Sequence, residues 1–186
     1  MVDKIADELG DISIFVSNAG IASRGLPVAA GSPEETQRVM RVHALGPEHL
    51  CRLILPGMRR QRRGDIVVIS SVSAHALSAN GGPYNMAKAA AEALAHTLAK
   101  EEAPNGIHVN IVAPGLVASE MGDRLAAARS GGAVTRADEL DGQSPYGHVC
   151  RPEEVADIVR FLVSAEAGYL TGQRIVVDGG AHPHRA

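Results

Sequence analysis

The sequence predicts an α/β domain in which helices cover both faces of a parallel sheet. Segments with strand and helix patterns alternate along all 186 residues, without an internal repeat or a linker between domains. The predicted strands are apolar throughout rather than alternating apolar and polar, as expected when both faces of a sheet are buried. Aromatic residues make up only 3% of the chain, so aliphatic residues and alanine must form the core. We therefore expect a single domain over residues 1–186.

Helix and strand signals define the elements of the first half of the chain. Ser32 and Pro33 are typical of an N-cap and a first helical turn, and Glu35 is placed to close a capping box. Gly46-Pro47 interrupts the helical pattern that follows, so we expect a disturbance there. In chain order the predicted elements are a helix before Gly10, a strand over Ile12–Val16, a helix from Pro33 to Leu45 resumed from Glu48 to about Arg60, and a strand over Asp65–Ser70.

The alanine-rich segment from Pro83 to Ala103 has the strongest helix pattern in the chain, and Pro104 ends it. A loop of small residues that includes Gly81-Gly82 precedes this helix. The elements predicted after it are a strand over Ile107–Ala113, a helix over Glu120–Arg129, an irregular stretch to Cys150, a helix from Pro152 to about Ser164, and a strand over Arg174–Val177.

Charge and composition exclude several classes of protein. With 18 Lys+Arg against 21 Asp+Glu, the net charge of -3 argues against a dedicated nucleic-acid binder. No apolar run approaches the ~20 residues of a membrane span, and the start of the chain lacks the pattern of a signal peptide. Two cysteines are too few for a disulfide scaffold, which favours a reducing compartment. We therefore expect a soluble, cytoplasmic protein.

Three further features have ordinary structural explanations. The basic run Arg59–Arg63 is better explained as the cationic end of a helix than as a nucleic-acid patch. His182 and His184 have no evident third ligand, so no metal site is expected. Cys51 lies in a predicted helix and is expected to be a buried apolar residue rather than a nucleophile.

Tyr84 and Lys88 stand four residues apart at the start of the alanine-rich helix, so they share one face. A tyrosine pKa near ~10 makes the free side chain a poor acid–base catalyst at neutral pH. An ammonium one turn away lowers that pKa and makes the hydroxyl a usable proton donor and acceptor. The chain has three lysines against fifteen arginines, so lysine is not its default cation. A chance pair on a helix surface is the alternative interpretation.

Small and polar residues follow three predicted strands at their carboxyl ends, the edge where open parallel sheets bind ligands. Ser71 follows the second strand, where its hydroxyl can donate to a substrate carbonyl that Tyr84 protonates. A serine that satisfies loop backbone groups is the alternative. Asn18-Ala19-Gly20 and Pro114-Gly115 follow the first and third strands and leave room for a ligand near the backbone. We expect these strand ends to meet at one crevice.

Taken in order, these motifs resemble the short-chain dehydrogenase/reductase family, in its single-domain branch, and most closely its 3-oxoacyl carrier-protein reductase-like members. Thirteen positions separate Ser71 from Tyr84, the spacing that the family's catalytic pair shows. The resemblance covers nearly the whole chain through NAG at 18–20, IVVISSVS at 66–73, YNMAK at 84–88, VNIVAPG at 109–115, RPEEVADIVRFLVS at 151–164 and YLTGQRIVVDGG at 169–180.

The resemblance implies a Rossmann-like, doubly wound parallel sheet and reversible hydride transfer between NAD(P) and a carbonyl or secondary alcohol, of 3-oxoacyl type. It implies that Tyr84 is the acid/base and that Ser71 positions the substrate oxygen. Lys88 would lower the tyrosine pKa and bind the nicotinamide ribose. The other implied cofactor contacts are Asn18, Ala19 and Gly20 beside the adenosine half, and Pro114, Gly115, Val117 and Ser119 beside the nicotinamide.

Two features depart from the family's pattern. His43 stands where the family has a catalytic asparagine that helps hold a proton-relaying water, and a relay role and a packing role are equal alternatives for it. The sequence contains no G-x-G, the turn that holds the cofactor pyrophosphate in the family. We therefore expect a sheet truncated at its N-terminal side, with about the last four of the family's seven strands and an exposed apolar edge on the first. The residue that selects NAD or NADP normally lies in the missing part, so that choice is open.

The sequence thus predicts an NAD(P)-dependent oxidoreductase with a small-molecule carbonyl or alcohol substrate and no nucleic-acid or membrane partner. Relatives pair through the alanine-rich helix and the long helix before it, so we expect a homodimer or homotetramer. A non-catalytic truncated homologue, acting only as a fragment or an oligomerisation partner, is the main alternative. A third possibility keeps the site but performs dehydration or epimerisation. Asn18-Ala19-Gly20 and Asp178-Gly179-Gly180 favour the dehydrogenase branch over it.

Overall fold

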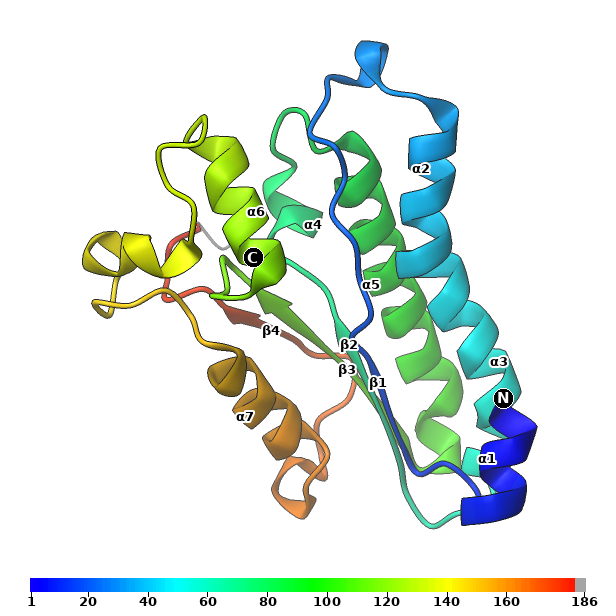
Figure 1. Ribbon diagram of the computed structural model, residues 1–186. Helices are drawn as coiled ribbons and strands as arrows, with labels where there is room; N and C mark the ends of the chain where they lie inside the picture. Colours follow the sequence, from blue (N-terminus) through cyan, green and yellow to red (C-terminus); the bar gives the residue numbers. More distant parts are fainter. Residues whose placement is uncertain (183–186) are drawn as a thin grey trace.

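Four parallel strands form one sheet at the centre of the computed structural model, which describes residues 1–182 (Figure 1). The strands follow one another in the order β1-β2-β3-β4. Their bounds are Ile14–Ser17 for β1, Gly64–Ile69 for β2, Ile107–Pro114 for β3 and Arg174–Val177 for β4. The register places Ile14 opposite Asp65, Gly64 opposite Ile107 and Ile111 opposite Arg174. Because every pair is parallel, all the carboxyl ends lie at the same edge of the sheet.

Helices cover both faces of this sheet, as predicted (Figure 1). The helices α2, α3 and α5 lie on one face and α7 lies on the other. No helix in the described part of the chain is long and apolar enough to cross a membrane. The α-helices are α1 Val2–Leu9, α2 Pro33–Met40, α3 Gly46–Met58, α4 Ser73–Ala76, α5 Gly82–Glu102, α6 Glu120–Arg129 and α7 Pro152–Leu162. A π-helix, η2, spans Arg41–Leu45, and 3-10 helices span Val28–Ala30, Ala103–Asn105, Ala137–Gln143 and Ala165–Ala167.

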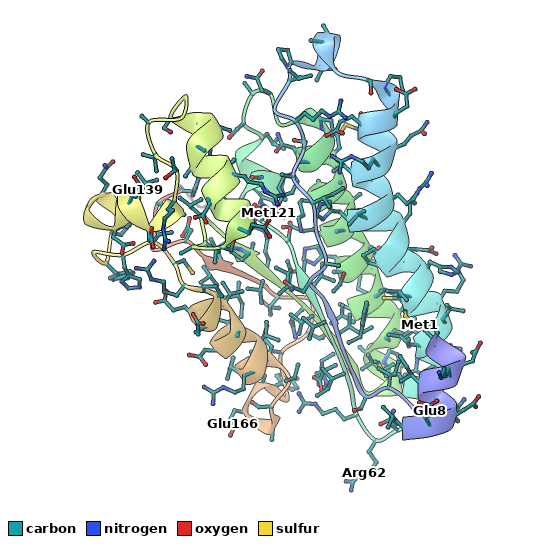
Figure 2. All side chains as sticks on the ribbon, in the orientation of Figure 1. Met1, Glu8, Arg62, Met121, Glu139 and Glu166 are labelled. Carbon is teal, nitrogen blue, oxygen red and sulfur yellow. The ribbon has the colours of Figure 1, made fainter. Side chains whose placement is uncertain are left out.

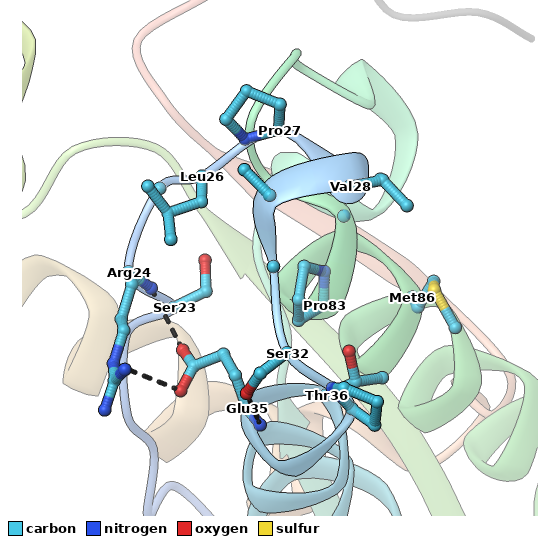
Figure 3. A pocket seen from close by; sticks show the side chains of 15 residues that line it. Ser23, Arg24, Leu26, Pro27, Val28, Ser32, Glu35, Thr36, Pro83 and Met86 are labelled. Atoms are coloured by element: carbon cyan, nitrogen blue, oxygen red, sulfur yellow. Dashed lines mark hydrogen bonds and ion pairs between the residues drawn. The ribbon is translucent and has the colours of Figure 1, made fainter.

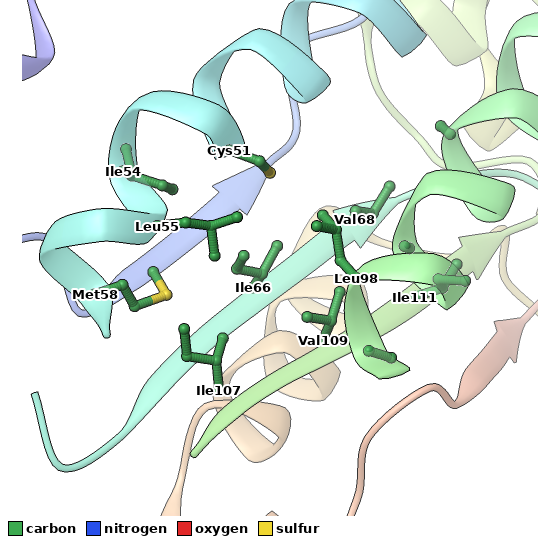
Figure 4. Packing of buried hydrophobic residues seen from close by; sticks show 13 residues of the cluster. Cys51, Ile54, Leu55, Met58, Ile66, Val68, Leu98, Ile107, Val109 and Ile111 are labelled. Atoms are coloured by element: carbon green, nitrogen blue, oxygen red, sulfur yellow. The ribbon is translucent and has the colours of Figure 1, made fainter. Parts of the chain in front are cut away.

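Alternate residues of β2 and β3 supply two separate cores. Ile66 and Val109 face α3 and α5 and are fully buried (Figure 4). Val67 and Val112 face the opposite side, where they pack against Leu162 of α7. Both strands are therefore buried on both faces, which explains why their sequences are continuous apolar runs. Cys51 belongs to the first core and is 3% exposed, and burial raises the pKa of its thiol to about 12.

The disturbance expected at Gly46-Pro47 takes the form of a π-helix that ends directly before Gly46, whose N–H bonds the Arg41 carbonyl. The residues on either side of this junction have helical dihedrals, so the N–H that Pro47 lacks is missing from a helix that runs through it. The expected capping box is also incomplete. Ser32 Oγ accepts a hydrogen bond from the Glu35 amide at 3.2 Å, but the Glu35 carboxylate bonds the guanidinium of Arg38 and the backbone N–H of Arg24 instead. A charge-assisted bond to arginine is the stronger one.

β1 begins at Ile14 rather than Ile12 and, among the described residues, pairs with β2 alone. Ile14 and Val16 are 47% and 37% exposed, and neither belongs to a hydrophobic cluster of residues 1–182. The prediction that this strand exposes apolar surface at the edge of the sheet is therefore confirmed.

Acidic partners neutralise most of the basic run at the end of α3. The helix-end interpretation is thus incomplete, because ion pairs as well as the helix dipole hold these cations. Arg62 projects away from the turn that precedes β2 (Figure 2). The ion pairs join Arg59 to Glu102, Arg60 to Asp11 and Arg63 to Asp65.

Candidate functional site

The carboxyl edge of the sheet brings Ser71, Tyr84 and Lys88 together. Ser71 lies two residues after β2, and Tyr84 and Lys88 lie one turn apart at the beginning of α5. The side chains of Ser71 and Tyr84 are hydrogen-bonded to each other. Lys88 Nζ lies 5.6 Å from the centroid of the Tyr84 ring. A hydroxyl, a phenol and an ammonium thus share one small region at the carboxyl edge of the sheet.

Ser71 also has the structural role that was its alternative interpretation. Its Oγ accepts a hydrogen bond from the Ser73 amide at 3.2 Å, at the beginning of the short helix α4. Its carbonyl oxygen accepts from the Arg174 guanidinium at 3.2 Å. The loop contacts therefore hold the residue in place while its hydroxyl still reaches Tyr84.

Lys88 is 5% exposed, and its ammonium donates to the carbonyl of Ile69, the last residue of β2, at 2.7 Å. Burial lowers the pKa of Lys88 to about 8, and the nearby Glu92 carboxylate opposes that shift. The amine is therefore mostly protonated at neutral pH. In this site a buried cation is held one turn from the phenol.

The net shift of the Tyr84 pKa is opposite to the lowering that was expected from Lys88. Burial raises the pKa of Tyr84, and the hydrogen bond from Ser71 opposes that effect without overcoming it. The physical reason is that burial penalises the phenolate more than the surrounding groups stabilise it. Tyr84 is therefore a neutral phenol at pH 7, the form that can donate a proton.

His43 borders Tyr84 from the π-helix η2, an element often found at functional sites. The two rings are T-shaped, with centroids 5.3 Å apart and an interplanar angle of 83°. His43 Nε2 lies 2.8 Å from the Ile21 carbonyl oxygen and 3.2 Å from the Ile21 amide nitrogen. Burial and the charge of Lys88 lower the pKa of His43 to about 4, so the imidazole is neutral. These contacts fit the packing alternative for His43.

The residues predicted to contact the cofactor lie on both sides of Ser71 at this edge. Asn18, Ala19 and Gly20 follow β1 and are exposed. A Cβ on Gly20 would lie 2.8 Å from Cε1 of His43, so only glycine leaves that ring in place. The segment after β1 is thereby held against η2.

The segment after β3 is held by the strand beside it. Gly115 donates to the Val177 carbonyl at 2.9 Å, and a Cβ on Gly115 would lie 2.9 Å from Cβ of Asp178. Val117 forms an isolated parallel bridge with Cys150, and Pro114 is buried as the last residue of β3. Ser119 is the N-cap of α6, where its Oγ accepts from the Gly122 amide at 3.2 Å. This N-cap role accounts for a hydroxyl at that position.

A cavity of about 310 Å³ lies on another side of the beginning of α5 (Figure 3). Its lining comes mainly from the loop between β1 and α2, together with Pro83 and Met86. Neither Ser71, Tyr84 nor Lys88 lines it. The chemistry-bearing residues therefore lie outside this cavity.

Sequence patterns did not reveal the polar cluster behind the site. Glu92 is 4% exposed and bonds Ser70, His75 and Arg174, three residues from three other parts of the chain. The available signals were a glutamate four residues after Lys88 on the same helix face and an arginine within a short apolar strand. Neither indicates a contact without the fold.

Comparison with known proteins identifies the family. A family model described as Enoyl-(Acyl carrier protein) reductase matches residues 1–182. The uncharacterized oxidoreductase YmfI of Bacillus subtilis is 37% identical over 171 residues, which are 92% of this chain and 67% of that protein. The 3-oxoacyl-[acyl-carrier-protein] reductase FabG of Thermotoga maritima is 36% identical over 182 residues, 97% of this chain and 70% of that protein. This chain belongs to the short-chain dehydrogenase/reductase family.

A solved structure of a dehydrogenase shares the Rossmann-like fold of this chain. NAD+-bound xylitol dehydrogenase superposes with a TM-score of 0.87 and 25% sequence identity, over 96% of this chain and 72% of that chain. The relatives are oxidoreductases, and the chain spans about two thirds of the length of those named above. Family membership thus places the chain among nicotinamide-dependent oxidoreductases in general.

Proposed function

We propose that the chain catalyses NAD(P)-dependent reduction of a carbonyl compound, and the reverse oxidation of a secondary alcohol, with Tyr84 as the acid/base. The observation that carries this proposal is the hydrogen bond between Ser71 and Tyr84 beside the buried Lys88. Similarity to the 3-oxoacyl-[acyl-carrier-protein] reductase of Thermotoga maritima supports a 3-oxoacyl substrate. The choice between NAD and NADP is left to the binding experiment.

The residues present fit the nicotinamide and ribose half of such a cofactor. An ammonium has three N–H donors, and among residues 1–182 a hydrogen bond to the Ile69 carbonyl engages one of them. The remaining donors suit the hydroxyls of a ribose. The exposed segment Asn18-Ala19-Gly20 and the loop from Pro114 to Val117 offer backbone and small side chains on either side. A nicotinamide cofactor, when bound, supplies or accepts a hydride.

In the reductive direction, Tyr84 donates its phenolic proton to the substrate oxygen as negative charge develops there. Its raised pKa keeps that proton available at neutral pH. The Ser71 hydroxyl, already within hydrogen-bond reach of the phenol, donates to the same oxygen and fixes its position. The charge of Lys88 stabilises the phenolate that remains after the transfer, because a cation favours the charged form of a neighbour.

A turnover assay with matched tyrosine variants tests this proposal. We expect the chain, at cofactor concentrations high enough to offset weak binding, to consume NADH or NADPH in the presence of 3-oxoacyl thioesters or simple ketones. Tyr84→Phe should lower kcat by about 10²–10⁴-fold, the range for loss of a general acid. Tyr146→Phe is the control, because Tyr146 is 78% exposed. Equal activity in the two variants contradicts the assigned role of Tyr84.

The non-catalytic alternative rests on the absence of a G-x-G turn from the sequence. A wild-type chain that folds yet shows no turnover with any of these substrates favours that alternative.

We propose the cytoplasm as the setting, which the two free cysteines Cys51 and Cys150 support.

A further inference from the structure

Glu92 lies one helical turn beyond Lys88 on α5 and is 4% exposed. Burying an ionised carboxylate is costly unless charged and hydrogen-bonding partners compensate it. The partners of Glu92 come from three elements or their ends, so this side chain joins α5 to the rest of the carboxyl edge.

Each carboxylate oxygen of Glu92 has well-placed donors. Ser70 Oγ donates to Oε1 at 2.6 Å, and His75 Nε2 lies 2.8 Å from Oε2. Arg174 Nε lies 2.9 Å from Oε1 and 3.1 Å from Oε2. The charged and titratable groups around the carboxylate are therefore His75 from α4, Arg174 from β4 and Lys88 from its own helix.

The same cluster reaches the candidate site in two ways. Arg174, held by Glu92, donates through Nη2 to the carbonyl oxygen of Ser71 at 3.2 Å. Glu92 also acts on Lys88 through its charge, which opposes the effect of burial on the lysine pKa. Among residues 1–182, the other titratable groups beside Lys88 are the neutral His43 and Tyr84, whose ring centroid lies 5.6 Å from Nζ.

We propose that Glu92 is a positioning residue that fixes the Ser71 peptide through Arg174 and sets the electrostatic environment of Lys88. This inference deepens the proposed function, because it assigns a role within the same site. Without the carboxylate, Arg174 loses its anchor and the Ser71 carbonyl loses a fixed donor. Lys88 would also be left buried without a nearby anion, which favours its neutral form.

An NMR titration of the lysine side chains tests the electrostatic part of the proposal on the 186-residue chain. The chain has three lysines, and Lys4 and Lys100 are exposed internal references. We expect Glu92→Gln to lower the titration midpoint of Lys88 by about one pH unit, since an adjacent opposite charge typically shifts a pKa by that amount or more. Glu101→Gln, an exposed change on the same helix, should leave it unchanged.

The carbonyl carbon shift of Ser71 tests the geometric part. It should move in Glu92→Gln and in Glu92→Asp, which keeps the charge but shortens the side chain. In Glu92→Asp the Lys88 midpoint should stay near that of the wild type. A Lys88 midpoint or a Ser71 shift in Glu92→Gln that matches Glu101→Gln overturns the proposal.

If Glu92→Gln does not fold, Arg174→Met tests the proposed role of Glu92 instead. It keeps the carboxylate and removes its main cation, so the Lys88 midpoint should rise and the Ser71 carbonyl shift should move. No change in either signal overturns the proposal. Neither measurement needs cofactor or turnover, so an inactive chain still gives an answer. If the proposed role of Glu92 fails, the turnover comparison of Tyr84→Phe with Tyr146→Phe still tests the proposed function on its own.

Discussion

The rings of His43 and Tyr84 meet edge to face, with their centroids 5.3 Å apart. This contact joins the π-helix η2 to the beginning of α5, and the bond of His43 Nε2 to Ile21 extends it to the segment after β1. The candidate acid/base is therefore supported by a neutral imidazole that is itself fixed by backbone. Any change that charges or displaces His43 should therefore alter the packing around the Tyr84 ring.

Protonation of His43 should destabilise the fold in acid. Its pKa is about 4 in the folded chain against 6.5 for the free group, so the unfolded chain binds more protons between these values. Stability is thus present above about pH 6.5 and is lost as the pH falls toward 4. Relative to His43→Asn, the wild type should lose about 2 kcal/mol between about pH 7.5 and about pH 5 in urea denaturation. Parallel pH profiles for the two proteins would show that His43 does not titrate in this way.

Gly20→Ala should displace the His43 ring, because the new Cβ would lie 2.8 Å from Cε1. Overpacking of this kind costs about 1–3 kcal/mol. Asparagine is smaller, so the same change should cost less in a His43→Asn background. A double-mutant cycle by urea denaturation measures the coupling. Additive costs would mean that the loop, rather than His43, absorbs the strain.

The ion pair of Arg59 with Glu102 should respond unequally to loss of either partner. Glu102 is 1% exposed, whereas the Arg59 side chain is 48% exposed. Arg59→Met removes the cation from a buried carboxylate that keeps the hydrogen bond from Asn105, and it should cost about 3 kcal/mol, the lower end of the range for breaking a buried pair. Glu102→Gln leaves a hydrated guanidinium and should cost about 1 kcal/mol, the net value of one hydrogen bond. Chemical denaturation of both variants checks the order, and equal costs would contradict it.

The 186-residue chain should bind NADH and NADPH weakly. Pyrophosphate recognition in this fold uses backbone N–H groups of a glycine-rich turn and the dipole of the helix after it, and the sequence has no G-x-G. Several charge-assisted hydrogen bonds of ~1.5–3 kcal/mol each are then missing, which lowers affinity by orders of magnitude. Calorimetry measures this directly. Micromolar affinity would mean that a further segment or a second subunit rebuilds the phosphate site.

We expect the chain to self-associate through the face of α2, α3 and α5. Large apolar side chains are exposed at the end of η2, on α3 and on α5, at Leu45, Leu53 and Met86. Light scattering should show a dimer or tetramer at micromolar concentration, and Leu53→Glu should shift it toward the monomer. Leu9→Glu is the control, since Leu9 is even more exposed than Leu53 but lies on α1. A monomeric wild type contradicts this expectation.

Local sequence patterns correctly predicted the helices and strands that short-range signals determine. The helix over Glu120–Arg129 and the strand over Arg174–Val177 have the predicted bounds, and the continuous apolar runs of β2 and β3 reflect burial on both faces. A disturbance was predicted at Gly46-Pro47, and the structure has a π-helix that ends directly before these residues. Its form, a wide turn within a helix that continues, does not follow from a Gly-Pro pair, which suits a break equally well.

Site properties that depend on tertiary burial were the hardest to predict. The spacing of Ser71, Tyr84 and Lys88 indicated one site, because parallel strand ends share an edge of the sheet. The direction of the Tyr84 pKa shift did not follow from an i, i+4 lysine, since burial of the phenol decides it. Glu92 was missed for the same reason, because its partners are distant in sequence.

The π-helix η2 absorbs one extra residue between α2 and α3. A π-turn holds one residue more than an α-turn, so a one-residue deletion within Arg41–Leu45 would restore regular helix. Because the wide turn takes up the extra residue, α3 would keep its rotation relative to α2, and Ile54 and Met58 would stay in the core. A one-residue deletion within α3 has no such turn to absorb it and would rotate the residues beyond it by about 100°. An alignment with homologous chains whose helix is continuous here therefore needs a one-residue gap at the π-turn.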